Sequence, residues 1–416
     1  MFFKKNKDFL KEVFLYTITS FGGPQGHLGM MLKTFVNKRK DLTEEELIEY
    51  NTFCQLLPGA SSTQLISIIG YKKGGVFLSI VTFLIWILPA CILMTLFSFY
   101  ITSHINKQPT INIFKYIQPM IIGFLLFTSL RAYKKSITNK ITFIIMVFGF
   151  ALLIFFFKIP WVLPTLIVAA GLSTNFSNKR FPKPTSEKPP IIRWTNIWLF
   201  VLLFTLAGFL SESARKENWE NRKIFNVFEN FYRFGSLVFG GGDVLLPMML
   251  DQYVARPDNI KIIKKNPGII KIDKSQLLTG YGIVKAIPGP VFSYASYMGG
   301  LALQEDGRKK QLLGCIVAGT AIFLPSILLV MFFFPIWQNI KKYVVFFRAL
   351  EGINAVIVGV MLATTLFLIN QLNITTFSTT SFFEIGIILS TFLLLNFTKI
   401  AAPIIVLISL LFGWVF

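Results

Sequence analysis

Charged side chains are scarce in this sequence, and histidine and cysteine are scarcer still. Only 15% of the 416 residues are charged, against about 25% in an ordinary soluble domain, and 54% are hydrophobic. The two histidines, His27 and His104, argue against a histidine-rich metal site. The three cysteines, Cys54, Cys91 and Cys315, stand singly in apolar stretches, so we interpret them as buried structural residues rather than as a disulfide framework.

Recognisable catalytic and nucleotide-binding motifs are also missing. No paired carboxylates, metal-spaced histidines or nucleophile motif stand in or near the apolar stretches, which argues against a membrane-embedded enzyme. No Walker-type glycine-rich loop is present, which argues against direct use of ATP. Lysine and arginine bring the net charge to +21, but they lie in short loops between apolar runs and therefore indicate cytoplasmic retention rather than nucleic-acid binding. The sequence thus predicts no enzymatic activity, no cofactor, no metal and no nucleic-acid partner.

Long apolar runs are what the sequence has in abundance. Each comes near the roughly 20 residues that a helix needs to cross the hydrocarbon layer of a bilayer. They include Val76–Tyr100, Ile141–Phe157, Trp194–Leu210, Leu312–Pro335 and Val344–Ile369. Backbone groups cannot stay unpaired in lipid, and the runs lack period-2 alternation, so they are predicted to be helices rather than barrel strands. The predicted fold class is an all-α polytopic membrane protein in contact with the lipid bilayer.

Several landmarks occur twice in the same order. Phe21–Pro24 and Phe239–Gly242 share a Phe-Gly-Gly motif, and each is followed at the same spacing by Met-Met-Leu. Leu57–Ala60 is matched in the same way by Ile287–Pro290. The same order and spacing in both places indicate a duplication, so the chain is predicted to consist of two homologous halves.

The halves are predicted at 1–175 and 220–416, separated at 176–219 by a basic linker and one spacer transmembrane segment. If each repeat crosses the membrane an even number of times, a single spacer inverts the second repeat. Loop charges agree, because residues 131–140 include four basic residues and no acid, whereas the counterpart at 370–381 carries no charge. The positive-inside rule then gives about 13 crossings of the cytoplasmic (inner) membrane, with a cytoplasmic N-terminus and an external C-terminus.

Glycine and proline interrupt two segments of each repeat. Gly22–Pro24 and Gly240–Gly242 interrupt the first segment, and Pro58-Gly59 and Pro288–Pro290 interrupt the second. Proline removes a helical hydrogen bond, glycine tolerates unwound backbone, and the freed groups cannot face lipid. Such breaks at matching positions point to a transporter's binding site, because half-helix N-termini present N–H groups and partial positive charge to an anion. We predict that the breaks meet near the midplane; packing glycines and simple kinks are the alternative, and whether the segments cross fully or re-enter is left open.

Polar residues beside the breaks complete the candidate site. Lys285, shortly before Pro288, is interpreted as a cation for a bound dianion; otherwise it reaches the interface or pairs with Asp243. His27 and Asp243 are candidate proton carriers, unless they brace the breaks. The candidate substrate-binding residues are Gly22, Gly23, Pro24, Gln25, His27, Pro58, Gly59, Gln64, Gly240, Gly241, Gly242, Asp243, Lys285, Pro288, Gly289 and Pro290.

Four motifs resemble the chromate ion transporter family in its long, two-domain form. They are FGGPQGHLGMM at Phe21–Met31, LPGASSTQ at Leu57–Gln64, FGGGDVLLPMM at Phe239–Met249 and AIPGPVFSYASYMGG at Ala286–Gly300. By this resemblance, which covers nearly the whole chain, the family's FGGP-x-x-H pattern ends on His27 and its PGP-x-x-x-Q pattern ends on Gln64. Two departures bear on anion preference more than on fold: Ala60 stands where the family usually has proline, and Lys285 where it often has glutamine.

The resemblance implies export of chromate by two fused halves of opposite orientation. A membrane potential that is negative inside expels a dianion, which favours export, and a proton is the candidate coupling ion. A sulfate or general oxyanion carrier is the alternative within the same class, and an anion channel or structural membrane subunit is the alternative from another class. The sequence leaves a homodimer, the physiological anion and the transport stoichiometry open.

Overall fold

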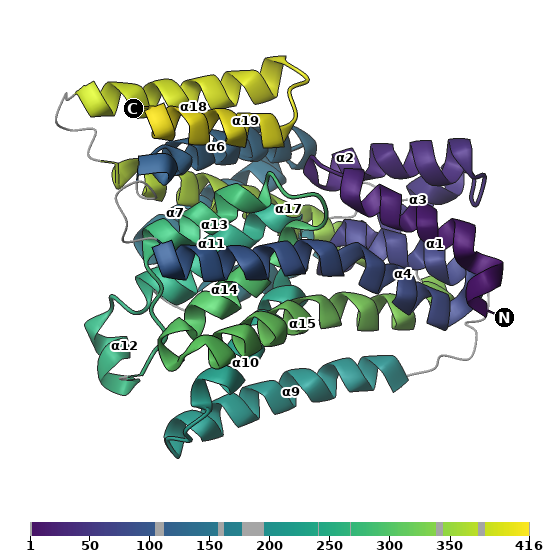
Figure 1. Ribbon diagram of the computed structural model, residues 1–416, viewed down its shortest axis with the longest axis horizontal. Coiled ribbons are helices and arrows are strands. Elements are labelled where there is room, and N and C mark those ends of the chain that lie inside the picture. Colours follow the sequence, from purple (N-terminus) through teal and green to yellow (C-terminus); the bar gives the residue numbers. More distant parts are fainter. Residues whose placement is uncertain are drawn as a thin grey trace. The chain divides into compact units, whose positions relative to one another are not determined.

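The structure of the 416-residue chain is a computed structural model (Figure 1). It describes residues 2–104, 112–156, 162–176, 195–239, 241–266, 268–337, 344–372 and 379–415. These residues form helices and no strand. The chain divides into two compact units, each built from segments of both sequence halves. Unit 1 comprises Met1–Tyr100, Thr185–Gly242 and Ile287–Lys342, and unit 2 comprises Ile101–Pro184, Asp243–Ala286 and Tyr343–Phe416.

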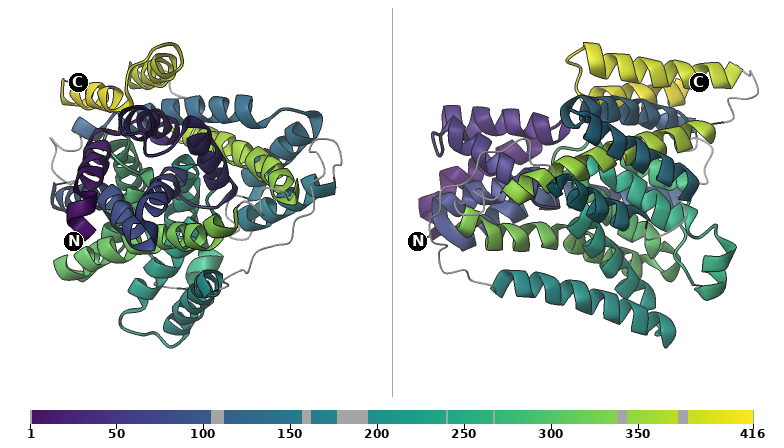
Figure 2. Two further views of the ribbon diagram at one scale, coloured as in Figure 1. Left: turned by 90° about the vertical axis from the view of Figure 1, so that its right-hand side faces the viewer. Right: turned by 180° about the vertical axis from the view of Figure 1, so that it is seen from behind.

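Unit 1 is centred on α15, which packs against α14, α10 and α9 (Figures 1 and 2). Its elements are α1 (Phe2–Thr19), α2 (Gly23–Met31), the π-helical η1 (Leu32–Lys38), α3 (Glu44–Leu56), most of α4 (Ser61–His104), α9 (Thr195–Lys216), α10 (Arg222–Leu237), the start of η3 (Gly242–Val244), η5 (Val291–Ser293), α14 (Tyr294–Ala302), η6 (Gln304–Asp306), α15 (Arg308–Phe333) and η7 (Phe334–Ile336). Glycine allows the close packing of α14 on α15, since a Cβ on Gly299 would lie 2.2 Å from the Gly314 carbonyl oxygen.

Unit 2 is centred on α17, which packs against α6, α7 and α8. Its elements are the end of α4, α6 (Ile117–Ser136), α7 (Lys140–Phe156), α8 (Val162–Ser173), η2 (Thr174–Phe176), α11 (Leu245–Leu250), η4 (Asp251–Ala255), α12 (Ile260–Lys265), α13 (Lys274–Val284), α17 (Val344–Asn370), α18 (Thr379–Phe397) and α19 (Ala402–Val415). The core of α7, α8 and α17 consists of the buried aliphatic residues Leu153, Leu166, Ala170, Val356, Val360 and Ala363.

Local sequence signals explain where several helices begin and bend. Before α3, the Thr43 hydroxyl accepts from the Glu46 N–H at 3.2 Å, and the Glu46 carboxylate accepts from the Thr43 N–H at 2.9 Å, which is a capping box. Before α13, the Asp273 carboxylate caps the Gln276 N–H at 3.0 Å. Within the 44-residue α4, Gly75 has φ 72° and bends the helix where the predicted apolar run begins.

Membrane-length helices account for the apolar composition. Five helices among the described residues are long and apolar enough to cross a bilayer: Ser61–His104, Asn112–Ser136, Ile197–Lys216, Arg308–Ile336 and Phe347–Asn370. Shorter apolar helices lie at Lys140–Phe155, Ser381–Phe397 and Ala402–Val415. Large apolar side chains are exposed along such helices, for example Leu96 (61%) on α4 and Phe209 (67%) on α9, as expected for surfaces that face lipid.

The described residues of every predicted apolar run fall on helices, so the helical membrane fold is confirmed. Phe157 and Trp194, at the ends of two runs, lie outside the described residues, as does 177–194, which includes most of the predicted basic linker. The number of crossings, the side on which each terminus lies and the repeat boundaries stay predictions.

Candidate functional site

The first break of each half is a short stretch of left-handed backbone. In the first half α1 ends at Thr19 and α2 begins at Gly23, and Gly22 and Gly23 have φ of 90° and 70°. In the second half Gly241, at the position that matches Gly23, has φ 114°; its neighbour Gly240 lies outside the described residues. Residues with a Cβ rarely adopt these values, so the glycines are needed for the chain to turn here.

The second break has the same form in both halves. α3 ends at Leu56 and α4 begins at Ser61, with Gly59 between them at φ 114°. The counterpart, Gly289, has φ 111°. The helices are therefore broken where the sequence predicted, and the matching φ values show that the two halves share one backbone conformation at this point.

Within unit 1 each half donates an equivalent backbone hydrogen bond to the other half. The Gly59 N–H donates to the Val238 carbonyl oxygen at 2.7 Å, and the Gly289 N–H donates to the Ser20 carbonyl oxygen at 3.0 Å. Ser20 and Val238 are themselves equivalent, because each immediately precedes the Phe-Gly-Gly motif of its half. Each second break is thus anchored on the first break of the opposite half, and this pairing satisfies backbone groups that an unwound segment leaves free.

Close contact from a neighbouring helix fixes each second break. An added Cβ on Gly59 would lie 2.2 Å from Ser326 Oγ, and one on Gly289 would lie 3.0 Å from the Cβ of Ala90. Ser326 and Ala90 are also equivalent, since each follows the proline inside α15 or α4. The Ala60 N–H donates to Ser326 Oγ at 3.2 Å, which holds the loop against α15.

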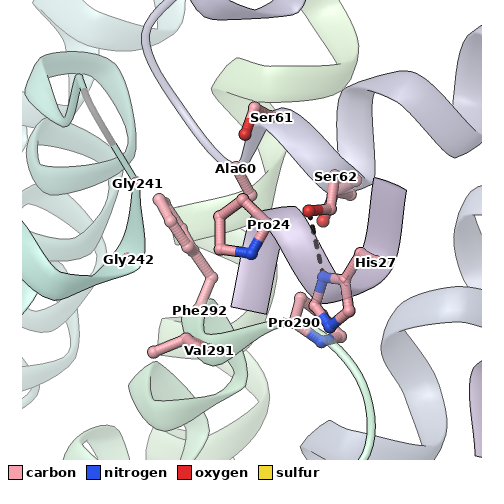
Figure 3. Close-up of a pocket in the computed structure, with 11 residues that line it drawn as sticks. Pro24, His27, Ala60, Ser61, Ser62, Gly241, Gly242, Pro290, Val291 and Phe292 are labelled. Carbon is pink, nitrogen blue, oxygen red and sulfur yellow. Dashed lines mark hydrogen bonds between the residues drawn. The ribbon is translucent and has the colours of Figure 1, made fainter. Parts of the chain in front are cut away.

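A small cavity of about 20 Å³ lies where these breaks come together in unit 1 (Figure 3). It is lined by Pro24, His27, Ala60, Ser61, Ser62, Thr63, Gly241, Gly242, Pro290, Val291 and Phe292. The lining comes from the first turn of α2, the start of α4, the glycines before η3 and the residues that open η5. All four breaks therefore contribute to one cavity, which in this conformation has room for about one water-sized group.

Hydrogen-bond donors dominate the polar part of the lining. The first N–H groups of a helix have no intrahelical partner and form its partially positive end. Here α2 and α4 begin at the cavity, and η5 leads from it into α14. The hydroxyls of Ser61, Ser62 and Thr63 add further donors, and none of the described lining residues is acidic. This arrangement suits a small anion.

His27 is the one titratable side chain in the lining. It is 2% exposed, and its Nδ1 lies 3.0 Å from Ser62 Oγ, the contact drawn in Figure 3. The ring meets Trp86 edge-on, with the centroids 5.1 Å apart. The other ring nitrogen, Nε2, is buried and has no hydrogen-bond partner among the described residues.

The remaining predicted residues of the first half support the loop rather than line the cavity. Gln64 Nε2 donates to the Pro58 carbonyl oxygen at 2.8 Å and so closes the turn from inside. Gly22, Gly23 and Gly59 supply backbone conformation. The side chain of Gln25 lies outside the described part of the chain. Gly289, which follows Pro288, has the corresponding backbone role in the second half.

Asp243 and Lys285 form an ion pair in unit 2. The Tyr281 hydroxyl donates to Asp243 Oδ1 at 2.8 Å, and Lys285 Nζ lies 4.7 Å from the Tyr281 ring centroid. The lysine side chain is 11% exposed and the aspartate 26%. The structure thus shows the ion pair that was the alternative interpretation of Lys285, and its role as a cation for the substrate stays a prediction. At the equivalent positions the first half has two neutral amides, Gln25 and Gln55.

Six of the lining residues were absent from the predicted site: Ala60, Ser61, Ser62, Thr63, Val291 and Phe292. A usable signal was present, because residues 60–62 and 290–292 directly follow the Pro-Gly break in their respective halves. The first residues after a helix break carry N–H groups that have no partner within the helix, so a ligand at the break lies beside these residues.

Comparison with known proteins gives a family match in both halves. The model of a family described as "Chromate transporter" matches residues 7–174 and 225–414. These two matched regions fit the two homologous halves inferred from the repeated motifs. No solved structure gives a significant match.

Three curated proteins are similar over most of their length. An uncharacterised transporter of Methanocaldococcus jannaschii is 23% identical over 363 residues, 84% of this chain and 81% of that protein. The chromate transport protein of Cupriavidus metallidurans is 22% identical over 417 residues, 98% of this chain and 93% of that protein. A probable chromate transport protein of Synechococcus elongatus is 22% identical over 341 residues, 77% of this chain and 74% of that protein.

Proposed function

Because the chain belongs to the chromate transporter family, we propose that it is a secondary transporter that exports chromate across the cytoplasmic membrane. The family is a transport family rather than an enzymatic one, and several membrane-length helices make the chain a multi-pass membrane protein. Export, a secondary mechanism and the inner-membrane location are parts of the proposal.

The donor groups that line the cavity in unit 1 are the observation that supports this function most directly, and the cavity must widen beyond its present water-sized volume to admit an oxyanion. A tetrahedral oxyanion presents only acceptor oxygens, so its site must consist of donors. The lining offers helix N–H groups and the hydroxyls of Ser61, Ser62 and Thr63. Because these donors are neutral, they stabilise the anion without holding it as strongly as a fixed cation would, which suits a substrate that must leave again.

The membrane potential supports export. Moving one elementary charge across the membrane changes the free energy by about 2.3 kcal/mol per 100 mV. A dianion leaving a cell that is negative inside therefore gains roughly twice that amount. Import against the same potential needs a coupled cation or proton, whereas export of the dianion can be driven by the potential alone.

A general oxyanion carrier, with sulfate among its substrates, is the second candidate. It is favoured by the uniform character of the lining, because neutral N–H and O–H donors recognise chromate and sulfate oxygens alike. Discrimination between the two dianions therefore depends on cavity size, to which Phe292 contributes a bulky, buried ring.

Flux measured with the full-length protein in liposomes tests the proposal. Chromate flux is followed with and without an imposed potential, and with excess sulfate as competitor. Flux that responds to the potential and resists sulfate supports a chromate exporter, whereas flux abolished by sulfate supports the general carrier. Absence of flux for both anions refutes oxyanion transport. Ser390→Ala, which removes an exposed hydroxyl on α18, is the matched control for variants of the cavity serines.

A further inference from the structure

His27 is a buried imidazole, and among the described residues no charged side chain contacts its ring. Its side chain is 2% exposed and lines the cavity, where Nδ1 is paired with Ser62 and Nε2 is unpartnered among the described residues. Burial away from water disfavours the charged form of a histidine unless an opposite charge lies close to it. Without a bound ligand, the ring is therefore expected to be neutral.

The described groups in contact with His27 are uncharged. From α1, the Tyr16 hydroxyl donates to the His27 carbonyl oxygen at 3.4 Å. From α4, Ser62 and Trp86 contact the ring. The ring itself contacts Ser62 and Trp86, and none of the other described residues that line the cavity is charged. An anion in the cavity would thus be the first counter-charge that His27 meets.

We infer that His27 takes up a proton when the anion binds, so that the site holds an oxyanion and one proton together. This inference rests on the proposed function and adds a proton-binding side chain to the same site. The proton comes from the aqueous phase and forms the Nε2–H bond, while Nδ1–H donates to Ser62 Oγ. This requires the neutral ring to carry its hydrogen on Nδ1, with Ser62 Oγ as acceptor, so the Ser62 hydroxyl hydrogen is available to an anion oxygen throughout. The imidazolium then supplies the positive charge that the neutral lining lacks.

Thermodynamic linkage makes the inference measurable. If the anion favours the protonated ring, protons must favour anion binding by the same factor. Between the pH at which the free ring titrates and the higher pH at which the anion-bound ring titrates, the dissociation constant is expected to fall about tenfold for each unit of pH decrease, the limit for one linked proton. Sulfate is the first probe, because it stays a dianion over the whole pH range, whereas chromate itself takes up a proton in mildly acidic solution. If sulfate does not bind, chromate at alkaline pH replaces it in both measurements below.

Calorimetry on the purified full-length protein tests the linkage. Sulfate is titrated in two buffers of different ionisation enthalpy, and the difference in heat gives the number of protons taken up. We expect the proton uptake to approach one at a pH where the free ring is neutral and the anion-bound ring is protonated, and to vanish at higher pH where both are neutral. His27→Asn keeps a group able to bond Ser62 but cannot be protonated, so its sulfate affinity is expected to be weaker and independent of pH.

A spectroscopic measurement keeps the test independent of that variant's folding. The chain has only two histidines, so His104→Asn leaves a single imidazole for isotope labelling. At constant neutral pH, sulfate is expected to move the nitrogen resonances of His27 from the neutral to the imidazolium position, with chloride as the control anion. If sulfate binds while the ring stays neutral and no proton is taken up or released, the inference is wrong but the proposed transport function stands. Failure of both sulfate and chromate to bind overturns the proposed function itself.

Discussion

Exchanging the ion pair of the second half for the amides of the first gives a direct test of how the duplicated sites differ. Asp243 and Lys285 stand where the first half has Gln25 and Gln55. The change is therefore made in three variants: Asp243→Gln, Lys285→Gln and the two together. The double variant copies a pair of side chains that the protein already has at the equivalent positions.

The structure sets the expected magnitude. Lys285 is 11% exposed and also lies over the Tyr281 ring, whereas Asp243 keeps 26% exposure and a hydrogen bond from the Tyr281 hydroxyl. Removing one partner of a buried ion pair costs 3–5 kcal/mol, and the residual exposure places each single variant near the lower end, about 3 kcal/mol. The double variant leaves no unpaired charge, so it is expected to lose much less than the sum of the two, about 1 kcal/mol.

Thermal denaturation in detergent, followed by the loss of monodisperse protein, measures the effect. At roughly 2–4 °C per kcal/mol for a domain of about 200 residues, each single variant is expected to lower the midpoint by about 6 to 12 °C. The double variant should recover most of that loss. Additive losses in the double variant would refute the reasoning, because they would mean that the two charges do not depend on each other. Normal chromate flux by a stable Lys285→Gln protein would also remove the lysine from any role in anion binding.

Three further predictions concern the breaks, the cavity and the membrane topology. Gly59→Ala is expected to sharply reduce the yield of monodisperse protein, because φ is 114° and the new Cβ would lie 2.2 Å from Ser326 Oγ. The control Gly386→Ala, in open space on α18, should leave the yield unchanged, and equal yields of the two variants would contradict the strain at Gly59. Ser62→Ala is expected to raise the chromate concentration for half-maximal flux about ten- to hundredfold, because it removes a hydrogen bond to a charged group worth about 1.5–3 kcal/mol. The control Ser390→Ala should leave this concentration unchanged, and an unaltered concentration in Ser62→Ala would mean that Ser62 is not part of the site. Reporters fused at Asn139 and Asn373, the latter outside the described residues, are expected to report opposite sides of the membrane; the same side for both would mean that the repeats are not inverted.

The sequence was most informative where physical constraint was strongest. Apolar runs near 20 residues have one structural solution in lipid, so helices such as α15 and α17 were predictable. Gly59 and Gly289 were identifiable as breaks, because proline and glycine together cannot continue a helix and the pattern occurs twice. Five of the residues predicted for the site, among them Pro24 and His27, line the cavity.

Features that depend on contacts distant in the sequence were not predictable. No local pattern shows that Gly59 bonds to a carbonyl 179 residues away, or that Ser326 lies against the same loop. Lys285 illustrates the limit differently, since one charged residue in an apolar segment fits both an ion pair and a substrate contact until its neighbour Asp243 is located. The division into two units that each combine both halves is likewise a property of tertiary packing.

The backbone hydrogen bonds between the two halves also set the order in which the chain can complete its fold during synthesis. The Gly59 N–H and the Ser20 carbonyl are synthesised early, but their partners, Val238 and Gly289, leave the ribosome about 180 and 270 residues later, respectively. Until then, each unpaired group within lipid costs several kcal/mol, so the first repeat must hold water, lipid headgroups or an insertion factor at its breaks. An N-terminal fragment ending before Val238 is therefore expected to be a quality-control substrate, and a nascent chain stalled there should be stabilised when the second repeat is supplied as a separate polypeptide.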